Sequence, residues 1–188
     1  MPTRELDVPG AYEVTPVVYP DERGSFFEWF RMDRLADETG VEFAVRQANV
    51  STSRKGVLRG IHFADVPPGQ AKFVTCMSGS VVDFVIDIRV GSPTFGRWDS
   101  VVLAAGKPTS VYISEGLGHA FLALEDDATV AYLLSSPYAP GAEHGIDPLD
   151  PEVGLDLRGL DVLLSQKDRE APTLAEAAAS GLLPNWAS

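Results

Sequence analysis

Short runs of alternating or β-branched residues, separated by glycine and proline, recur along most of the 188-residue chain. A period of two places every second side chain on the same face, which is typical of β-strands that bury one face. The expected strands are 11–19, 25–31, 71–76, 80–89, 110–113, 119–124 and 128–134. Seven or more strands without long helices between them predict an all-β sandwich or barrel of the jelly-roll kind.

Two segments have helical rather than strand periodicity, and both are expected to lie at the periphery. They are 32–39 and 174–183, the second beginning after Pro172 and Thr173 and rich in alanine. Within 80–89, polar positions switch between Asp83 and Asp87, which suggests a strand buried on one face with a β-bulge between the two aspartates. The length, with no repeat or linker, predicts a single domain over residues 1–188.

Charge and hydropathy exclude several classes of protein. The net charge of −12 argues against DNA or RNA binding, because phosphate recognition needs a positive surface. No stretch has the pattern of a signal peptide or the length of a membrane span, so a cytoplasmic protein without a membrane partner is expected. The single cysteine, Cys76, lies in an apolar run and is interpreted as a buried structural thiol.

The segment 138–163 is rich in proline, glycine and acidic residues and shows little periodicity. Loops of this length in a compact domain are usually functional, so the segment is expected to form a lid or a wall of a site. The alternative is an ordinary surface loop that takes no part in a site.

The three histidines, His62, His119 and His144, do not have the spacing of a metal site. Metal-binding cupins present two histidines one residue apart on one strand, with a carboxylate and a later third histidine. That pair is missing here, so no metal is expected.

Several polar residues interrupt apolar runs and are candidates for chemistry. Arg59 and His62 stand three apart in the run 57–63 and together indicate an anion-binding group beside a proton-transfer group. Lys72 lies between Ala71 and Phe73, where burial would lower its pKa and make it a useful proton donor. A core histidine and a lysine on the wet face of a strand are the alternatives.

Further candidates follow later in the chain. His119 comes after a glycine-rich turn that permits close approach of a ligand. Tyr132 could supply a phenolic proton, although an aromatic residue in an apolar strand is more often part of the core. Asp168 lies far along the chain from His62, and spacing alone does not establish that they pair.

Taken in order, these segments resemble the family of dTDP-4-keto-6-deoxyglucose 3,5-epimerases from about residue 9 to residue 174. The matching motifs are Asp21-Glu22-Arg23-Gly24-Ser25-Phe26-Phe27-Glu28, Gln47-Ala48-Asn49-Val50-Ser51, Leu58-Arg59-Gly60-Ile61-His62, Gln70-Ala71-Lys72, Asp87-Ile88-Arg89 with Ser92-Pro93-Thr94-Phe95-Gly96, and Leu164-Ser165-Gln166-Lys167-Asp168. The resemblance implies a cupin-type jelly-roll sandwich with short peripheral helices, a homodimer formed by strand exchange, and catalysis without metal or cofactor. The implied substrate is a dTDP-4-keto-6-deoxyhexose.

The resemblance also assigns roles. His62 would remove the proton beside the ketone, with Asp168 orienting it, while Lys72 and His119 would donate to the oxygen on carbon 4. Tyr132 would return a proton to the opposite face. The substrate-binding positions implied by the resemblance are Arg23, Phe26, Glu28, Gln47, Asn49, Arg59, His119 and Tyr138.

The chain departs from the family pattern in the loops near Ile146 and Leu157, where the family usually has tryptophans. With the tail 181–186, these losses resemble the branch that serves antibiotic deoxysugar pathways, and favour inversion at carbon 3 with or without carbon 5. Three alternatives remain at this point: a non-catalytic cupin that binds a nucleotide sugar, a 3,4-ketoisomerase acting on the same sugar, and a metal-dependent cupin.

Overall fold

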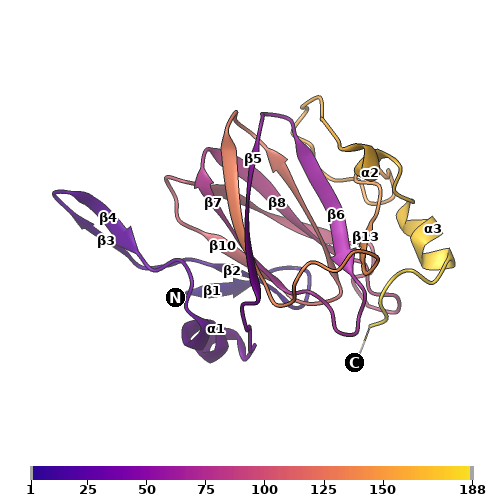
Figure 1. The fold of residues 1–188 in the computed structure, drawn as a ribbon, viewed down its shortest axis with the longest axis horizontal. Coiled ribbons are helices and arrows are strands. Elements are labelled where there is room, and N and C mark those ends of the chain that lie inside the picture. The colour runs from indigo at the N-terminus through magenta and orange to yellow at the C-terminus, as the bar shows by residue number, and fades with distance from the viewer. Residues whose placement is uncertain (1, 187–188) are drawn as a thin grey trace.

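The computed structural model describes residues 2–186, which form two packed antiparallel sheets, a projecting hairpin and short helices (Figure 1). The six-stranded sheet has the order β1 (Thr3–Glu5), β2 (Ala11–Val14), β10 (Ser110–Ile113), β7 (Lys72–Ser78), β12 (Ala128–Leu134) and β5 (Gln47–Ser53). The five-stranded sheet has the order β13 (Glu143–Gly145), β6 (Leu58–Ala64), β11 (Leu117–Ala123), β8 (Ser80–Asp87) and β9 (Trp98–Ala104). The all-β prediction is confirmed.

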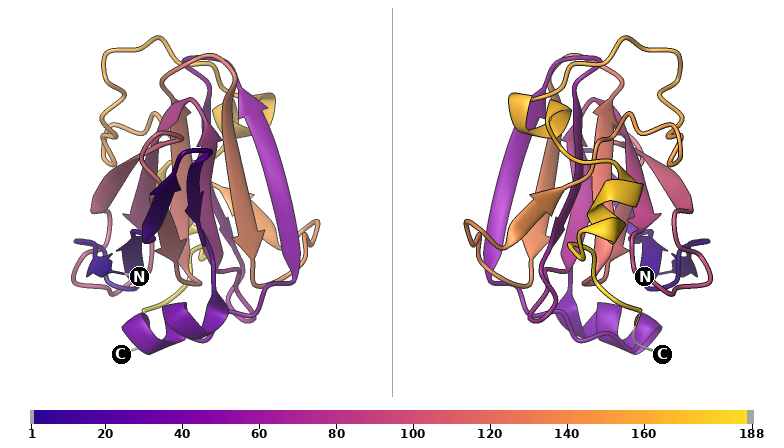
Figure 2. Two further views of the ribbon diagram at one scale, coloured as in Figure 1. Left: turned by 90° about the vertical axis from the view of Figure 1, so that its left-hand side faces the viewer. Right: turned by 90° about the vertical axis from the view of Figure 1, so that its right-hand side faces the viewer.

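The main core lies between the two sheets, where the alternating apolar residues meet. Strand β8 shows how it is built: Val81 and Val85 join the inter-sheet core, whereas Val82, Phe84 and Ile86 pack on the other side. That other side is covered by the C-terminal segment, seen in yellow against the outer face of the sheet in Figure 2. The expectation that this strand is buried on one face is therefore wrong, because a segment distant in sequence covers the second face.

Other boundaries also differ from the expected ones. The run 11–19 divides at Pro16 into β2 and β3 (Val18–Asp21), and the run 25–31 yields β4 (Gly24–Phe27). Strand β8 pairs with both neighbours in continuous register, so the bulge expected between its aspartates is wrong. A register shift occurs instead in β11, between His119 and Phe121.

The helices are short, as predicted, and lie outside the sheets. Helix α1 (Met32–Thr39) has the predicted bounds, and α2 (Gln166–Arg169) was not predicted. Helix α3 (Leu174–Ala179) is shorter than expected; its first turn is closed by a capping box in which Thr173 and Glu176 satisfy each other's backbone amides. Within residues 2–186, none of the helices is long and apolar enough to cross a bilayer.

The hairpin β3–β4 projects away from the body of the molecule (Figure 1). Two aromatic side chains on it are largely exposed, Tyr19 at 60% and Phe26 at 68%. Large exposed aromatic rings on a projecting element are typical of a contact surface rather than of a free surface. Cys76, on β7, is buried as expected.

Candidate active site

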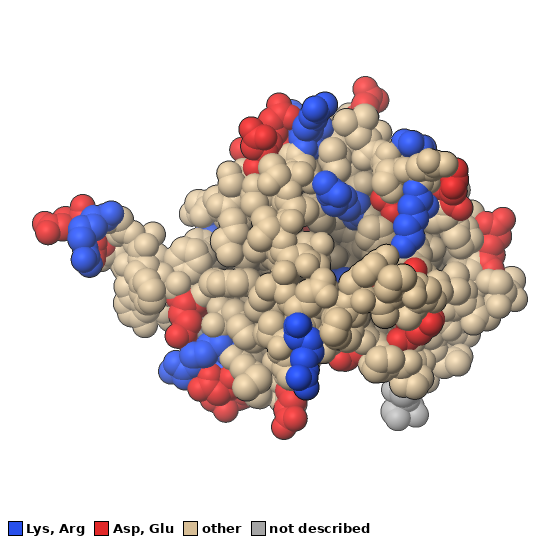
Figure 3. All heavy atoms as spheres, in the orientation of Figure 1, with Lys and Arg blue, Asp and Glu red and all other residues tan. Residues whose placement is uncertain are grey.

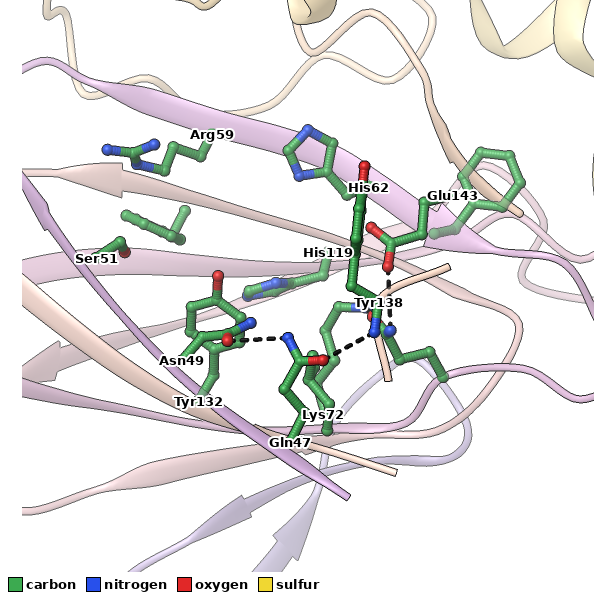
Figure 4. Close-up of a pocket in the computed structure, with 14 residues that line it drawn as sticks. Gln47, Asn49, Ser51, Arg59, His62, Lys72, His119, Tyr132, Tyr138 and Glu143 are labelled. Atoms are coloured by element: carbon green, nitrogen blue, oxygen red, sulfur yellow. Dashed lines mark hydrogen bonds between the residues drawn. The ribbon is translucent and has the colours of Figure 1, made fainter. Parts of the chain in front are cut away.

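A cavity of about 270 Å³ opens between the two sheets and takes side chains from both (Figure 4). Strands β5, β7 and β12 form one wall and β6, β11 and β13 the other. The lining residues are Gln47, Asn49, Ser51, Arg59, His62, Phe63, Gln70, Lys72, His119, Phe121, Tyr132, Leu134, Tyr138 and Glu143. Lysine and arginine side chains also stand around a hollow on the face shown in Figure 3. Basic groups are thus gathered locally on an acidic protein, as an anionic ligand requires.

His62 and Asp168 form a pair across 106 positions of sequence. His62 Nε2 lies 2.7 Å from Asp168 Oδ1, and the aspartate is buried while the histidine is half-exposed toward the cavity. Asp168 is held at the start of α2, where its backbone N–H donates to the Ser165 hydroxyl at 3.1 Å. Burial alone would raise the pKa of Asp168, but the hydrogen bond from His62 and its positive charge outweigh burial and lower that pKa.

The ionisation of Asp168 fixes the tautomer of His62. An ionised carboxylate only accepts hydrogen bonds, so the proton lies on Nε2 when the imidazole is neutral. Nδ1 is then the basic nitrogen, and the carboxylate stabilises the positive charge that forms when Nδ1 takes a proton. The pair therefore has the arrangement that general-base catalysis requires.

A second histidine and aspartate pair stands directly beside the first. His119 on β11 is the cross-strand partner of His62 on β6. Its Nε2 lies 2.7 Å from Oδ2 of Asp83, which is fully buried on β8. Asp83 was not among the predicted site residues, although an acidic residue inside the apolar run 81–86 was the signal that could have found it.

Lys72 is buried at the start of β7, with its ammonium group in the cavity. Burial lowers the pKa of Lys72 to about 8, an effect that the negative charge of Glu143 partly offsets. This agrees with the expectation of a buried lysine with a lowered pKa, and the wet-face alternative is wrong.

The lowered pKa of Lys72 predicts how kcat/KM changes at alkaline pH. If its ammonium group assists catalysis, kcat/KM should fall as the pH rises through about 8, because deprotonation removes the donor. The measurement is kcat/KM between pH 6 and 10 for the natural protein and for Lys72→Arg, whose guanidinium stays protonated. Residual activity of the arginine variant should lack this decline, and an identical decline in both proteins would contradict the prediction.

The wall opposite His62 carries Tyr132 and a set of amide side chains. Tyr132 on β12 is the cross-strand partner of Asn49 on β5. Gln47 Nε2 donates to Asn49 Oδ1 at 3.0 Å, and the backbone N–H of Tyr138 donates to Gln47 Oε1 at 2.8 Å (Figure 4). The amides thus tie the loop that carries Tyr138 to β5 and leave the Tyr138 ring exposed at the rim of the cavity.

Arg59, on β6 of the five-stranded sheet, forms hydrogen bonds across the cavity to β5 of the six-stranded sheet. Its Nε donates to the Ser53 hydroxyl at 3.1 Å and its Nη2 to the Thr52 carbonyl at 3.4 Å. The neighbouring Gly60 has a φ of +132°, and a Cβ there would lie 2.6 Å from Ala120 Cα. Only glycine permits this backbone approach, which holds β6 and its side chains against β11.

Three predicted binding residues are not in the cavity. Arg23 lies on the hairpin and pairs with Asp21 at 2.6 Å, Phe26 is exposed on the same hairpin, and Glu28 lies near Arg31 at 3.5 Å. The structure therefore does not bring these residues to the pocket of their own chain.

Some pocket residues were not predicted, and the loop was predicted in part. Ser51 follows Gln47 and Asn49 at a spacing of two, so strand alternation could have identified it. Glu143 lies in the loop 138–163 among similar acidic residues, and its local sequence gave no signal. That loop forms a pocket wall at Tyr138 and Glu143, whereas its later part packs on the apolar cluster of the second sheet.

Chemically, the cavity offers an oriented base on one wall, a phenol on the other and a buried cation between the sheets. In residues 2–186, no three histidine, cysteine or acidic side chains gather as a possible metal site. The fold and the site together define the class as a jelly-roll protein whose cavity carries the groups that acid–base chemistry uses.

The chain belongs to the dTDP-4-dehydrorhamnose 3,5-epimerase family, whose sequence profile matches residues 5–176, and it is a sugar-nucleotide epimerase. It is 56% identical over 192 residues to the dTDP-4-dehydrorhamnose 3,5-epimerase of Mycolicibacterium smegmatis, covering 100% of this chain and 92% of the relative. The dTDP-4-dehydrorhamnose 3-epimerase of Streptomyces niveus is 50% identical over 188 residues, covering 100% and 91%.

Solved structures are similar over nearly the whole chain. The rmlC epimerase of Mycobacterium tuberculosis superposes with a TM-score of 0.96 at 53% identity, covering 99% of this chain and 94% of that chain. A 3'-monoepimerase from Streptomyces bikiniensis in complex with dTDP-quinovose gives a TM-score of 0.92 at 49% identity, covering 96% and 91%. These likenesses confirm the predicted cupin-type jelly-roll sandwich and the predicted family.

Proposed function

We propose that the protein inverts carbon 3 of dTDP-4-keto-6-deoxyglucose by removing and returning a proton through an enolate, as a step of deoxysugar biosynthesis. The observation that carries this proposal is the His62 and Asp168 pair in one cavity with Lys72 and Tyr132. A proton beside a ketone is weakly acidic, and its removal needs both a base and stabilisation of the enolate oxygen.

The two walls of the cavity support a two-sided proton transfer. His62 on β6 takes the proton from carbon 3, and the electron pair of the broken C–H bond forms the enolate with its charge on the carbon 4 oxygen. Lys72 donates a hydrogen bond to that oxygen, and His119, whose Nε2 faces Asp83, donates a second one from Nδ1 when its imidazole is protonated. Tyr132, on the opposite sheet, gives a proton to the other face of carbon 3, which restores the ketone with inverted configuration.

The remaining pocket residues fit a nucleotide diphosphate. Arg59 supplies positive charge for a phosphate, and the exposed ring of Tyr138 is available to stack on the base. Gln47 and Asn49 offer amide groups on the adjoining strand. The dTDP-quinovose complex of the Streptomyces bikiniensis relative supports a dTDP-sugar as ligand.

Inversion at carbon 3 is common to the activities named for the relatives. Those at 49–56% identity include both 3,5-epimerases and 3-epimerases. A product analysis tests the proposal: dTDP-4-keto-6-deoxyglucose is incubated with the protein, reduced with borohydride, and the sugars are analysed by NMR. Products inverted at carbon 3 are expected; the starting configuration alone, or a carbonyl moved to carbon 3, would contradict the proposal.

We further propose that the protein is a homodimer in which the hairpin β3–β4 of one chain reaches the pocket of the second chain. Two observations support it: Arg23 and Phe26 lie outside their own pocket, and the hairpin exposes Phe26 and Tyr19. Strand β5, which forms part of the pocket wall, is also an edge of its sheet, and no strand within residues 2–186 pairs with its outer side.

Complementation between two variants tests this arrangement. His62→Ala removes the base from the pocket of its own chain. Arg23→Ala removes a contact that the hairpin makes in the pocket of the partner chain. Each variant homodimer should therefore have a lowered kcat/KM. In a heterodimer with exchanged hairpins one of the two sites is intact, so co-expressed chains should recover about a quarter of the natural activity if they associate randomly. Activity no higher than the average of the two variants would contradict exchange.

A further inference from the structure

Gln70 is a buried pocket residue to which the mechanism above gives no role. It precedes Lys72 by two positions, just before β7 begins, and both side chains line the cavity. Its Oε1 accepts a hydrogen bond from Lys72 Nζ at 2.9 Å. Its Nε2 faces Glu143 Oε1 at 3.3 Å and the Ser136 carbonyl at 3.4 Å.

The three contacts of Gln70 agree on one orientation of its amide. The oxygen faces a cation that only donates, and the NH₂ group faces a carboxylate and a carbonyl that accept. Rotating the amide by half a turn would place NH₂ against the ammonium and the oxygen against the carboxylate. The side chain is therefore fixed by its partners, and it joins the buried cation on β7 to the anion on β13.

The charges around Lys72 show why its connection to Glu143 through Gln70 matters. Among residues 2–186, the other titratable or charged groups that line the cavity are Arg59, His62, His119, Tyr132, Tyr138 and Glu143. Of these, Glu143 is the group whose negative charge raises the pKa of Lys72, against the larger lowering by burial. A buried ammonium without an acceptor is costly, and Gln70 provides the acceptor.

We infer that Gln70 is a positioning residue, whose amide holds the Lys72 ammonium in the cavity and connects it to Glu143, so that β13 helps to keep Lys72 charged. Its bearing on catalysis rests on the proposed function, in which Lys72 donates to the enolate oxygen. The coupling itself concerns the protein without substrate.

The test is an NMR titration of Lys72 in the intact protein. The chain has four lysines, so ¹³C-lysine labelling gives few signals, and Lys72→Arg assigns the one of interest. Glu143→Gln and Gln70→Leu should move the titration to lower pH, and Gln70→Glu to higher pH, each by about one unit, because a nearby charge or hydrogen bond shifts a buried group by that order. Opposite shifts are not expected of a residue that merely fills space.

Asp65→Asn is the matched control. It removes the same charge from the neighbouring pair of Asp65 with His144, which lies beside Glu143 on β13, and should leave the Lys72 titration unchanged. An unchanged titration in both Glu143→Gln and Gln70→Glu would overturn the inference even if Gln70→Leu does not fold. The alkaline decline of kcat/KM should move with the titration in each variant; a titration that moves while this decline stays would overturn the positioning role. The titration needs no substrate, so its failure is distinguishable from failure of the proposed function.

Discussion

Replacing His62 with alanine should lower the rate of proton exchange at carbon 3 by about 10²–10⁴-fold, the usual contribution of a general base. His62 is held 2.7 Å from a buried carboxylate, and no other group of the proposed mechanism takes the substrate proton. The measurement is deuterium exchange in heavy water, followed by NMR. Nucleotide binding, measured by calorimetry with dTDP, should stay near the natural value because Arg59 and Tyr138 are unchanged.

Two further variants separate loss of the base from loss of the fold. His62→Ala leaves Asp168 buried without its partner, which should cost about 1–3 kcal/mol of stability. His62→Gln keeps an amide donor close to the position of Nε2 for Asp168 but has no basic nitrogen, so it should be better folded and equally slow. His144→Ala is the matched control, since it removes a histidine from a similar 2.7 Å pair with Asp65 and should retain exchange. Substantial exchange by both His62 variants would rule out His62 as the base.

The second large effect is expected from Tyr132→Phe, which should exchange the substrate proton with solvent yet yield almost no inverted product. His62 would still remove the proton and return it to the same face, while the acid on the opposite wall is missing. Loss of a general acid commonly costs about 10²–10⁴-fold, here in net inversion rather than in exchange. Both rates can be followed in one NMR experiment, with washout read at carbon 3 and inversion from the product signals.

Tyr112→Phe is the control for Tyr132→Phe. Tyr112 is a buried tyrosine on β10 that packs with Phe43 and Phe73 and does not line the cavity, so removing its hydroxyl should alter neither rate. Normal inversion by Tyr132→Phe would show that the second acid lies elsewhere.

The sequence predicted the fold where strands are apolar runs and missed it where tertiary contacts decide. Strands β7, β10 and β12 are such runs, buried over most of their length, and lie close to the expected ranges. Strand β5 was missed because Gln47–Ser53 is an edge strand with polar residues on the pocket face and exposed residues on the other. The double burial of β8 depends on the C-terminal segment, which local periodicity does not reveal.

The site was predicted mainly from a family resemblance, and the structure explains why residue patterns alone were insufficient. His62 and Asp168 are far apart in sequence, and only the packing of α2 beside β6 brings them into contact. Glu143 lies near the Lys72 ammonium and Asp83 faces His119, each from a different strand. Asp83 could be noticed only as an acidic residue in an apolar run, and Glu143 had no local signal. Arg23 and Phe26 lie on a hairpin directed away from their own pocket, so the fold of one chain does not bring them to the site; in the proposed homodimer they reach the pocket of the second chain.

Incubation with dTDP-4-keto-6-deoxyglucose in heavy water, with deuterium at carbons 3 and 5 followed by proton NMR, tests the central claim most directly. The account predicts deuterium at carbon 3, with carbon 5 also labelled if the protein is a 3,5-epimerase. Tight binding of this substrate with no deuterium at either carbon would contradict it.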